Sequence, residues 1–300
     1  MSTSTASAAS AASTAAAPFR RAPDRHLDVG AGQVAYRRFG RGPDVLFVHG
    51  WPVSGATFRS LVPYLAPHVT CHVIDLPGAG DSRFDASTPL SLDDHIRSVR
   101  RVIDRLELDD LAVVGHDSGG LIARHAVAGD RRVRAMGLVN TEQPQGLGWR
   151  FKLFLAPRRL PGFGAALGWV IGQRGLRRNK FILGDAFADP SRLDGEFDEL
   201  FLRPLHEQPA RLDAALRLLR SFDERRVLEL GEVHAKITVP VQLVWGDRDP
   251  FFPLAWAKEM VGTFPDARLH VVEGAGLFVH EERPQEVAQA LLPVLLETRQ

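Results

Sequence analysis

The sequence places an aspartate where a buried strand ends and a helix begins. An apolar run over residues 111–114 reads as a short buried strand, and a helical pattern starts at about Leu121. Between them stands Gly115-His116-Asp117-Ser118-Gly119-Gly120. A sharp strand-to-helix turn of this kind forms a nucleophile elbow, whose central side chain projects from a strained backbone. We therefore expect a nucleophile in this turn; the alternative is an ordinary glycine-rich connection without chemistry.

Spacing around the turn indicates which residue is central. The residues two before and two after the centre must be small, because otherwise the turn cannot close. Around Asp117 these residues are Gly115 and Gly119, whereas around Ser118 one of them is His116. We therefore interpret Asp117, in preference to Ser118, as the nucleophile.

An aspartate nucleophile suits attack on a saturated carbon that bears a leaving group, such as a halide or an epoxide oxygen. The product of this attack is a covalent ester on the enzyme. Water must then hydrolyse the ester, which requires a general base, an acid that orients the base, and donors for the developing negative charge. A chain that uses this chemistry must therefore supply all three parts.

The elements that position these parts alternate between strand and helix patterns, which indicates a mostly parallel central sheet flanked by helices. The expected strands cover residues 26–29, 33–39, 44–48, 69–74, 111–114, 133–139, 239–245 and 269–272. From 141 to 236 only helical periodicity remains, so this segment is expected to be a helical cap insertion above the carboxyl ends of the strands. The predicted division is an Ala/Ser-rich disordered tail over 1–22, a core over 23–140 and 237–300, and a cap over 141–236.

Composition limits the classes of function. The 300 residues carry a net charge of +1, which provides no overall field for nucleic acid, and include a single cysteine. No apolar run approaches the length of about 18 residues that a transmembrane helix needs. We expect a cytoplasmic protein that binds neither nucleic acid nor, by a spanning helix, a membrane; its oligomeric state stays open.

Three motifs together resemble the α/β-hydrolase superfamily. They are the Gly115-His116-Asp117 elbow, His49-Gly50-Trp51-Pro52 after an expected strand, and the loop over residues 75–82. Within the superfamily the elbow is similar to those of haloalkane dehalogenases and epoxide hydrolases, which use an aspartate nucleophile. The likeness covers roughly residues 26–297, although in the cap only position and helicity match. It implies an α/β-hydrolase fold, a hydrolase acting on a small apolar organic substrate, and no cofactor or metal.

The resemblance also assigns roles outside the elbow. It implies that the backbone N–H groups of Trp51 and Ser118 form the oxyanion site and help to bind the leaving group. It identifies Asp249, in Trp245-Gly246-Asp247-Arg248-Asp249-Pro250, as the carboxylate that orients the base. The alternative for Asp249 is a loop carboxylate paired with Arg248.

The base is the point at which this sequence departs from the family pattern. Relatives read Gly-x-Gly-His-Phe after the last strand, and this chain reads Gly274-Ala275-Gly276-Leu277-Phe278. Leucine cannot accept a proton, and loss of a positioned base typically costs roughly 10²–10⁴-fold in rate. His280, about one helical turn further on, is the nearest substitute. The alternative for His280 is a partly exposed histidine in the first turn of a helix.

The leaving-group side also differs from that of the relatives. Dehalogenases of this type carry a tryptophan directly after the nucleophile, and its N–H holds the halide. Here that residue is Ser118, and Trp51, Trp149 or Trp169 is the alternative donor. Epoxide hydrolases use two cap tyrosines, and the only tyrosines are Tyr36 and Tyr64, both outside the cap. Two hypotheses follow. One is a hydrolase with a relocated base or stalled at the ester; the other is a ligand-binding protein on a hydrolase scaffold, similar to plant gibberellin receptors.

A basic stretch marks the expected cap. Residues 151–180 contain lysines and arginines but no Asp or Glu. An anionic ligand, a membrane surface or a partner protein would each suit this pattern. The simpler interpretation, which we favour, is a solvated face balanced by the acidic stretch over 185–199.

Overall fold

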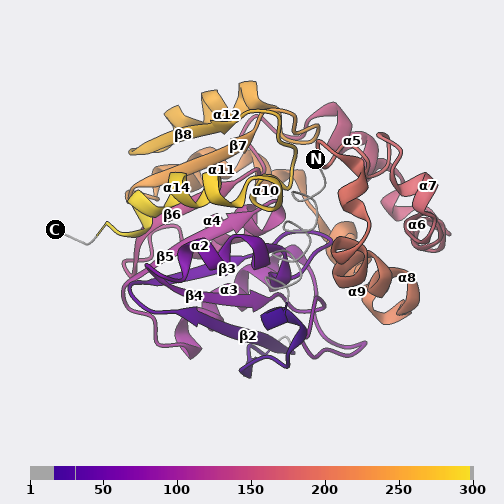
Figure 1. The fold of residues 1–300 in the computed structure, drawn as a ribbon, viewed down its shortest axis with the longest axis horizontal. Coiled ribbons are helices and arrows are strands. Elements are labelled where there is room, and N and C mark those ends of the chain that lie inside the picture. The colour runs from indigo at the N-terminus through magenta and orange to yellow at the C-terminus, as the bar shows by residue number, and fades with distance from the viewer. Residues whose placement is uncertain (1–16, 31, 298–300) are drawn as a thin grey trace, which may run out of the picture.

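The computed structural model describes residues 17–30 and 32–297, and its centre is an eight-stranded sheet (Figure 1). Strands β3 to β8 run parallel, whereas β1 and β2 pair antiparallel at one edge. In chain order the strands are β1 (Arg25–Asp28), β2 (Gln33–Gly40), β3 (Asp44–Val48), β4 (Thr70–Asp75), β5 (Leu111–His116), β6 (Val133–Val139), β7 (Val241–Gly246) and β8 (Ala267–Val272). Their spatial order is β1-β2-β4-β3-β5-β6-β7-β8, so the predicted α/β-hydrolase fold is confirmed.

The register of two central strands brings the predicted site together. Val48, the last residue of β3, pairs with Gly115 in β5. Both strands are buried along almost their whole length, as apolar β-branched runs in the middle of a parallel sheet are expected to be. The loop that begins at His49 and the elbow at Asp117 therefore leave the sheet side by side.

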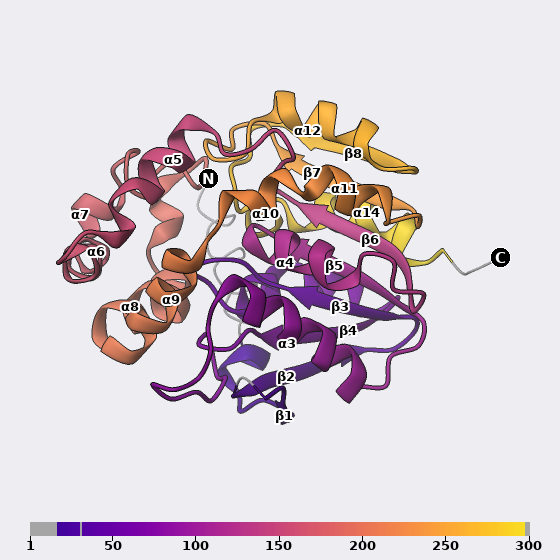
Figure 2. The same cartoon turned by 180° about the vertical axis from the view of Figure 1, so that it is seen from behind.

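Helices cover both faces of the sheet. Helices α3 (Leu92–Arg105), α4 (Ser118–Val127) and α11 (Leu230–Ala235) pack together on one face (Figure 2). Helices α2 (Val62–Leu65) and α14 (Pro284–Leu295) contact one another on the other face (Figure 1). The remaining core elements are η2 (Gly55–Ser60), α12 (Leu254–Met260), η6 (Val261–Thr263) and α13 (Val279–Glu282).

The segment between β6 and β7 is helical, as predicted. In the described chain from 140 to 240 the regular elements are α5 (Trp149–Leu155), η3 (Ala156–Arg159), α6 (Phe163–Gly172), α7 (Arg174–Arg177), η4 (Pro190–Leu193), η5 (Asp198–Leu202), α8 (Arg203–Glu207), α9 (Pro209–Ser221), α10 (Glu224–Leu228) and α11. Helices α5 to α9 lie together at one end of the sheet (Figures 1 and 2). Helix α11 instead contacts α4, so the end of the predicted cap returns to the flank of the core.

The start of the fold differs from the prediction. Residues 1–16 of the predicted tail lie outside the described residues, but 17–20 form the short helix η1. Phe19 is buried, and its ring lies 5.0 Å from that of Phe39. Arg37 donates a hydrogen bond of 3.0 Å to the carbonyl of Arg21. A tail boundary at residue 22 is therefore wrong, because the ring of Phe19 and the carbonyl of Arg21 both contact the core.

None of the helices built from the described residues combines the length and the apolar character that a membrane span requires.

Candidate active site

The elbow has the strained geometry that its sequence predicts. Asp117 has φ 51° and ψ −139° and directly precedes α4, in which Ser118 is the first residue. A Cβ added to Gly115 would lie 2.6 Å from the Cα of Gly120. A Cβ added to Gly119 would lie 2.3 Å from the carbonyl oxygen of His49. Only glycine fits at either position, so Asp117 is the residue that the turn projects.

The carboxylate of Asp117 faces the loop that follows β3. The backbone N–H of Trp51 donates a hydrogen bond of 2.7 Å to Oδ2 of Asp117 and lies 3.0 Å from Oγ of Ser118. The approach is so close that a Cβ on Gly50 would stand 2.3 Å from the same Oδ2. The two amides predicted to hold developing negative charge, those of Trp51 and Ser118, both interact with this carboxylate.

Burial controls the acidity of the candidate nucleophile. Removal from water raises the pKa of Asp117 well above its ordinary 3.8, and the nearby Glu142 carboxylate raises this pKa further. The amides of Ser118 and Trp51 act in the opposite direction because they stabilise the ionised form. The site therefore combines a desolvated carboxylate with donors aimed at it.

Asp117 lines a small apolar cavity of about 60 Å³. The cavity wall comes partly from the core and partly from the helical segment between β6 and β7. Its aromatic side chains are those of Trp51, Phe151, Phe154, Phe222, Phe251, Phe252 and Phe278. Ser118 and Leu277 also line it, and Asp117 is its one titratable group among the residues of 17–30 and 32–297. A carboxylate in such an environment suits a substrate that is small and mostly apolar.

The structure places the predicted substitute base away from this cavity. His280 is fully buried, lies in α13 and is absent from the described lining residues. Its Nε2 lies 2.8 Å from Oγ1 of Thr57, whose hydroxyl donates to Oε1 of Glu281. Nε2 must therefore donate, and the histidine is fixed in a buried network. The structure does not support His280 as the base, because its buried side chain contacts Thr57 and does not line the cavity among the described residues.

Charge repulsion and burial also oppose protonation of His280. Desolvation first, and then the neighbouring His116 and Arg59, lower its pKa well below 6.5. The rings of His280 and His116 meet edge to face at 4.3 Å. His116 in turn lies 3.0 Å from the carbonyl of Leu277, so it supports the loop in which the family carries its base. Both side chains are thus buried, and neither lines the cavity of Asp117 among the described residues.

Asp249 is buried and held by donors rather than paired with Arg248. Its Oδ1 accepts hydrogen bonds from the amides of Phe251 and Phe252, at 2.8 and 3.1 Å. Its Oδ2 accepts one of 2.6 Å from Nδ2 of Asn140. Burial nevertheless raises the pKa of Asp249 to about 7. The carboxylate of Asp249 is therefore fixed by three donors, and it forms no ion pair in the described part of the chain.

Three further residues around the elbow were not predicted as parts of the site. Arg124 is fully buried and donates to the carbonyls of Gly120 and Glu142, at 3.0 and 2.7 Å. Oγ1 of Thr141 donates to the carbonyl of Asp117 at 2.8 Å. Glu142 is close enough to Asp117 to act on it electrostatically, and burial raises the pKa of Glu142. An arginine within a short apolar helix was the one signal that could have revealed this support.

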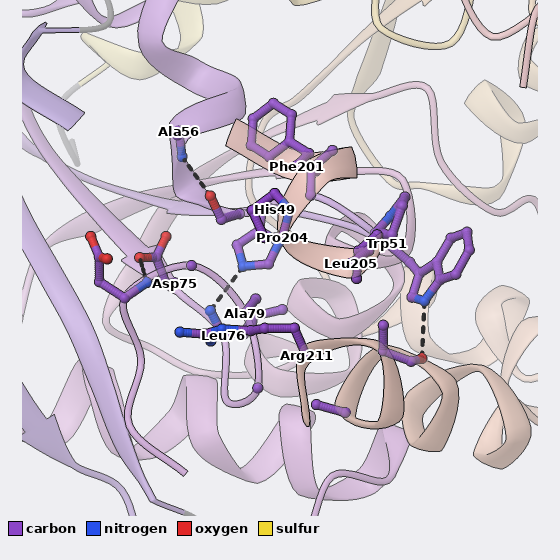
Figure 3. A pocket seen from close by; sticks show the side chains of 18 of the residues that line it. His49, Trp51, Ala56, Asp75, Leu76, Ala79, Phe201, Pro204, Leu205 and Arg211 are labelled. Carbon is purple, nitrogen blue, oxygen red and sulfur yellow. Dashed lines mark hydrogen bonds between the residues drawn. The ribbon is translucent and has the colours of Figure 1, made fainter. Parts of the chain in front are cut away.

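A larger cavity lies on the other side of Trp51. It has a volume of about 240 Å³ and shares Trp51, Pro52 and Leu218 with the cavity of Asp117. Figure 3 shows this larger cavity, with the indole of Trp51 donating a hydrogen bond of 3.0 Å to the carbonyl of Ala215 in α9. Asp117 does not line it among the described residues, so we place the chemistry in the smaller cavity.

Neither Trp149 nor Trp169 can replace the missing halide-binding tryptophan in this arrangement. Both side chains are exposed, and neither lines the cavity as far as the described residues define it. The indole N–H of Trp51 is already bonded to α9. The hydroxyl of Ser118 and the amide of Trp51 are therefore the polar donors nearest to the nucleophile.

Comparison with known proteins places this geometry in a family. Residues 45–290 match the alpha/beta hydrolase family. The chain is similar to "Haloalkane dehalogenase 2" of Mycobacterium tuberculosis, with 28% identity over 89% of this chain and 93% of the relative. It is also similar to "Pimeloyl-[acyl-carrier protein] methyl ester esterase" of Xanthomonas campestris pv. campestris, with 29% identity over 89% of this chain and 96% of that one. The structure of the epoxide hydrolase CorEH superposes with a TM-score of 0.73 at 22% identity, covering 90% of this chain and 97% of that chain. The chain therefore belongs to the alpha/beta hydrolase family.

Proposed function

We propose that this hydrolase attacks a saturated carbon bearing a leaving group through Asp117 and forms a covalent ester. The observation that carries the proposal is the Asp117 carboxylate, projected by a strained elbow into an apolar cavity and held at 2.7 Å by the amide of Trp51. The similarity to a relative named as a haloalkane dehalogenase supports a halide as the leaving group.

The first step needs no proton if the leaving group is a halide. A carboxylate oxygen of Asp117 bonds to the carbon, and the carbon–halogen bond breaks with its electron pair, which leaves as halide. Opening an epoxide would produce an alkoxide that requires a proton. The hydroxyl of Tyr36 is bonded to His72 at 2.8 Å, and Tyr64 is exposed, so neither tyrosine supplies that proton to the cavity. We therefore favour alkyl halides over epoxides.

The second step is where this chain stalls. Hydrolysis of the ester requires a water molecule that loses a proton as it attacks. Leu277 stands at the family's base position, and Asp117 itself, the cavity's titratable group, is consumed in the ester. We propose that the ester accumulates and that its hydrolysis is slow.

The size of the cavity limits the substrate. Its volume of about 60 Å³ corresponds to the space of roughly two water molecules at about 30 Å³ each. Short primary halides such as bromoethane or 1-bromopropane match this size. The esterase relative does not lead us to propose ester hydrolysis, because Ser118 begins α4 and is not the residue that the elbow projects.

Intact-mass spectrometry after incubation with short bromoalkanes tests the proposal. We expect one alkyl group per chain, mapped by peptide digestion to Asp117, with little free alcohol. Asp117→Asn should abolish the adduct, whereas Asp247→Asn, in an exposed position two residues before Asp249, should retain it. Rapid alcohol formation without an adduct would contradict the stall. Neither adduct nor alcohol across the panel would contradict Asp117 as a nucleophile and leave ligand binding as the function.

A further inference from the structure

Exposed apolar side chains gather in one part of the helical segment. Among the described residues nine large apolar side chains are exposed, and six of them lie within residues 149–181, here named the cap edge. The six are Trp149, Leu153, Leu160, Trp169, Leu176 and Phe181. Single exposed apolar side chains are ordinary on a protein surface, but a cluster indicates a surface that a membrane or another molecule covers.

The elements of the cap edge adjoin one another. Helix η3 contacts both α5 and α6, and α6 contacts α7. Both views place α6 and α7 at the extreme end of the molecule, far from the C-terminus (Figures 1 and 2). Leu167 and Ile171 of α6 are buried, whereas Trp169 between them is 58% exposed. The inner face of this helix is therefore packed against the protein, whereas Trp169 on its outer face contacts solvent.

The charge of the cap edge has one sign. Residues 143–184 contain no Asp or Glu. Part of the positive charge is balanced from outside the cap edge, as the sequence predicted. The balanced residues are Arg150 with Asp185, Arg177 and Arg178 with Asp194, and Lys152 with Glu224. In the described part of the chain Arg158, Arg159, Arg174 and Lys180 form no ion pair.

We infer that the cap edge docks on the surface of an anionic lipid bilayer. Tryptophan, leucine and phenylalanine interspersed with lysines and arginines that form no ion pair are the composition of a segment that lies in a membrane interface. The apolar groups enter the headgroup boundary while the cations meet anionic lipid headgroups. A second copy is a poorer occupant, because a shared two-fold face would bring the same unpaired cations together.

Helix α5 connects this surface with the candidate active site. Trp149 and Leu153, one turn apart, are 71% and 54% exposed. Phe151 and Phe154 of the same helix line the cavity of Asp117. A docked cap edge would place the cavity wall next to the lipid phase, in which apolar substrates concentrate. Only this last consequence rests on the proposed function, since the docking itself does not require Asp117 chemistry.

Co-sedimentation with vesicles tests the inference. The full chain is mixed with vesicles of phosphatidylcholine alone or of phosphatidylcholine with phosphatidylglycerol, in low and high salt. We expect binding to the anionic vesicles that weakens with salt, and little binding to the zwitterionic ones. Trp149→Ser combined with Trp169→Ser, and separately Arg159→Gln combined with Arg174→Gln, should each reduce the partition coefficient roughly tenfold or more.

Matched controls come from exposed residues elsewhere on the fold. Leu228→Ser with Leu296→Ser, and Arg41→Gln with Arg268→Gln, should bind vesicles as the unaltered chain does. Alkylation of Asp117 by a water-soluble bromoalkane, measured without vesicles, reports separately on the site. Absence of binding to anionic vesicles overturns the inference, as does equal loss in the control pairs. Sedimentation velocity that shows a dimer abolished by the cap-edge pairs overturns it in favour of a second copy.

Discussion

Leu277 lines the same cavity as the carboxylate of Asp117, and its loop packs against the loop of the buried acid. The amide of Arg248 donates a hydrogen bond of 2.9 Å to the carbonyl of Ala275. A Cβ on Gly246 would stand 2.3 Å from the carbonyl of Gly276. The candidate nucleophile Asp117 and the candidate acid Asp249 therefore lie in or against the loops around Leu277, whose side chain cannot carry a proton.

We expect Leu277→His to restore turnover. An imidazole there can accept the proton of an attacking water, and we expect Asp249, whose loop packs against the loop of Leu277, to orient it. The rate of ester hydrolysis should rise roughly 10²–10⁴-fold, measured as alcohol released from a bromoalkane and as decay of the adduct mass. Leu277→Gln adds polarity without a base and should leave the adduct stable. Equal rates in the two variants would argue against a missing base as the block.

The rate of adduct formation should increase with pH. Only the ionised carboxylate is nucleophilic, and burial together with Glu142 raises the pKa of Asp117 well above 3.8. The midpoint of the rate profile, followed by intact mass, should therefore lie well above that of a free carboxyl group. Glu142→Gln removes the neighbouring negative charge and should move the midpoint to lower pH. A flat profile from about pH 5 to about pH 9 would contradict the raised pKa.

Asp249 should make the fold less stable as pH rises. Its pKa in the folded chain is about 7, above the ordinary 3.8, so folding favours the protonated form. This stabilising contribution is complete below about pH 3.8 and is lost as pH rises through about 7. The difference between these two pKa values corresponds to a loss of about 4 kcal/mol in the free energy of unfolding. Urea unfolding across this range should show a flatter profile for Asp249→Asn than for the unaltered chain; parallel profiles would count against the assignment.

Gly50→Ala should damage the site. The added methyl would stand 2.3 Å from Oδ2 of Asp117 and must displace either the carboxylate or the Trp51 loop. Misplacement by about 1 Å can cost roughly 100-fold, and we expect at least that loss in adduct formation. Gly231→Ala, in α11 with no atom within 4 Å of the new Cβ, is the control and should stabilise the fold by about 0.5–1 kcal/mol. An unchanged alkylation rate in Gly50→Ala would show that the elbow tolerates the methyl.

The sheet could be predicted because its strands are short apolar runs bounded by turn residues. Residues 44–48 and 133–139 form strands with the predicted bounds. The helical character of the cap was also predictable from periodicity. Its return to the core was not, because the contact of α11 with α4 depends on tertiary packing that no local pattern encodes. Phe19 is a similar case, since a single aromatic residue after an Ala/Ser-rich stretch carries too little signal to indicate burial.

The elbow could be predicted because glycine spacing is a local steric requirement. The role of Asn140 could not be predicted. Its Nδ2 donates to Asp249, and its Oδ1 accepts from the amide of Gly246 at 3.0 Å. Asn140 therefore connects the loop after β6 to the loop after β7, which lies more than a hundred residues further along the chain. His280 was misjudged for a related reason. Helical spacing would place His280 on the same face as position 277. The helix begins only at Val279, however, and the backbone at Phe278 is not helical, so this spacing does not apply.

Trp51 contacts the candidate nucleophile and two helices of the segment between β6 and β7. Its amide holds Asp117, its indole holds Ala215 of α9, and its ring meets Phe154 of α5 at 5.4 Å. Trp51 is therefore a single residue through which the candidate nucleophile is connected to both helices. Replacement of its side chain would remove the contacts with α5 and α9 together, while the amide that binds Asp117 would remain.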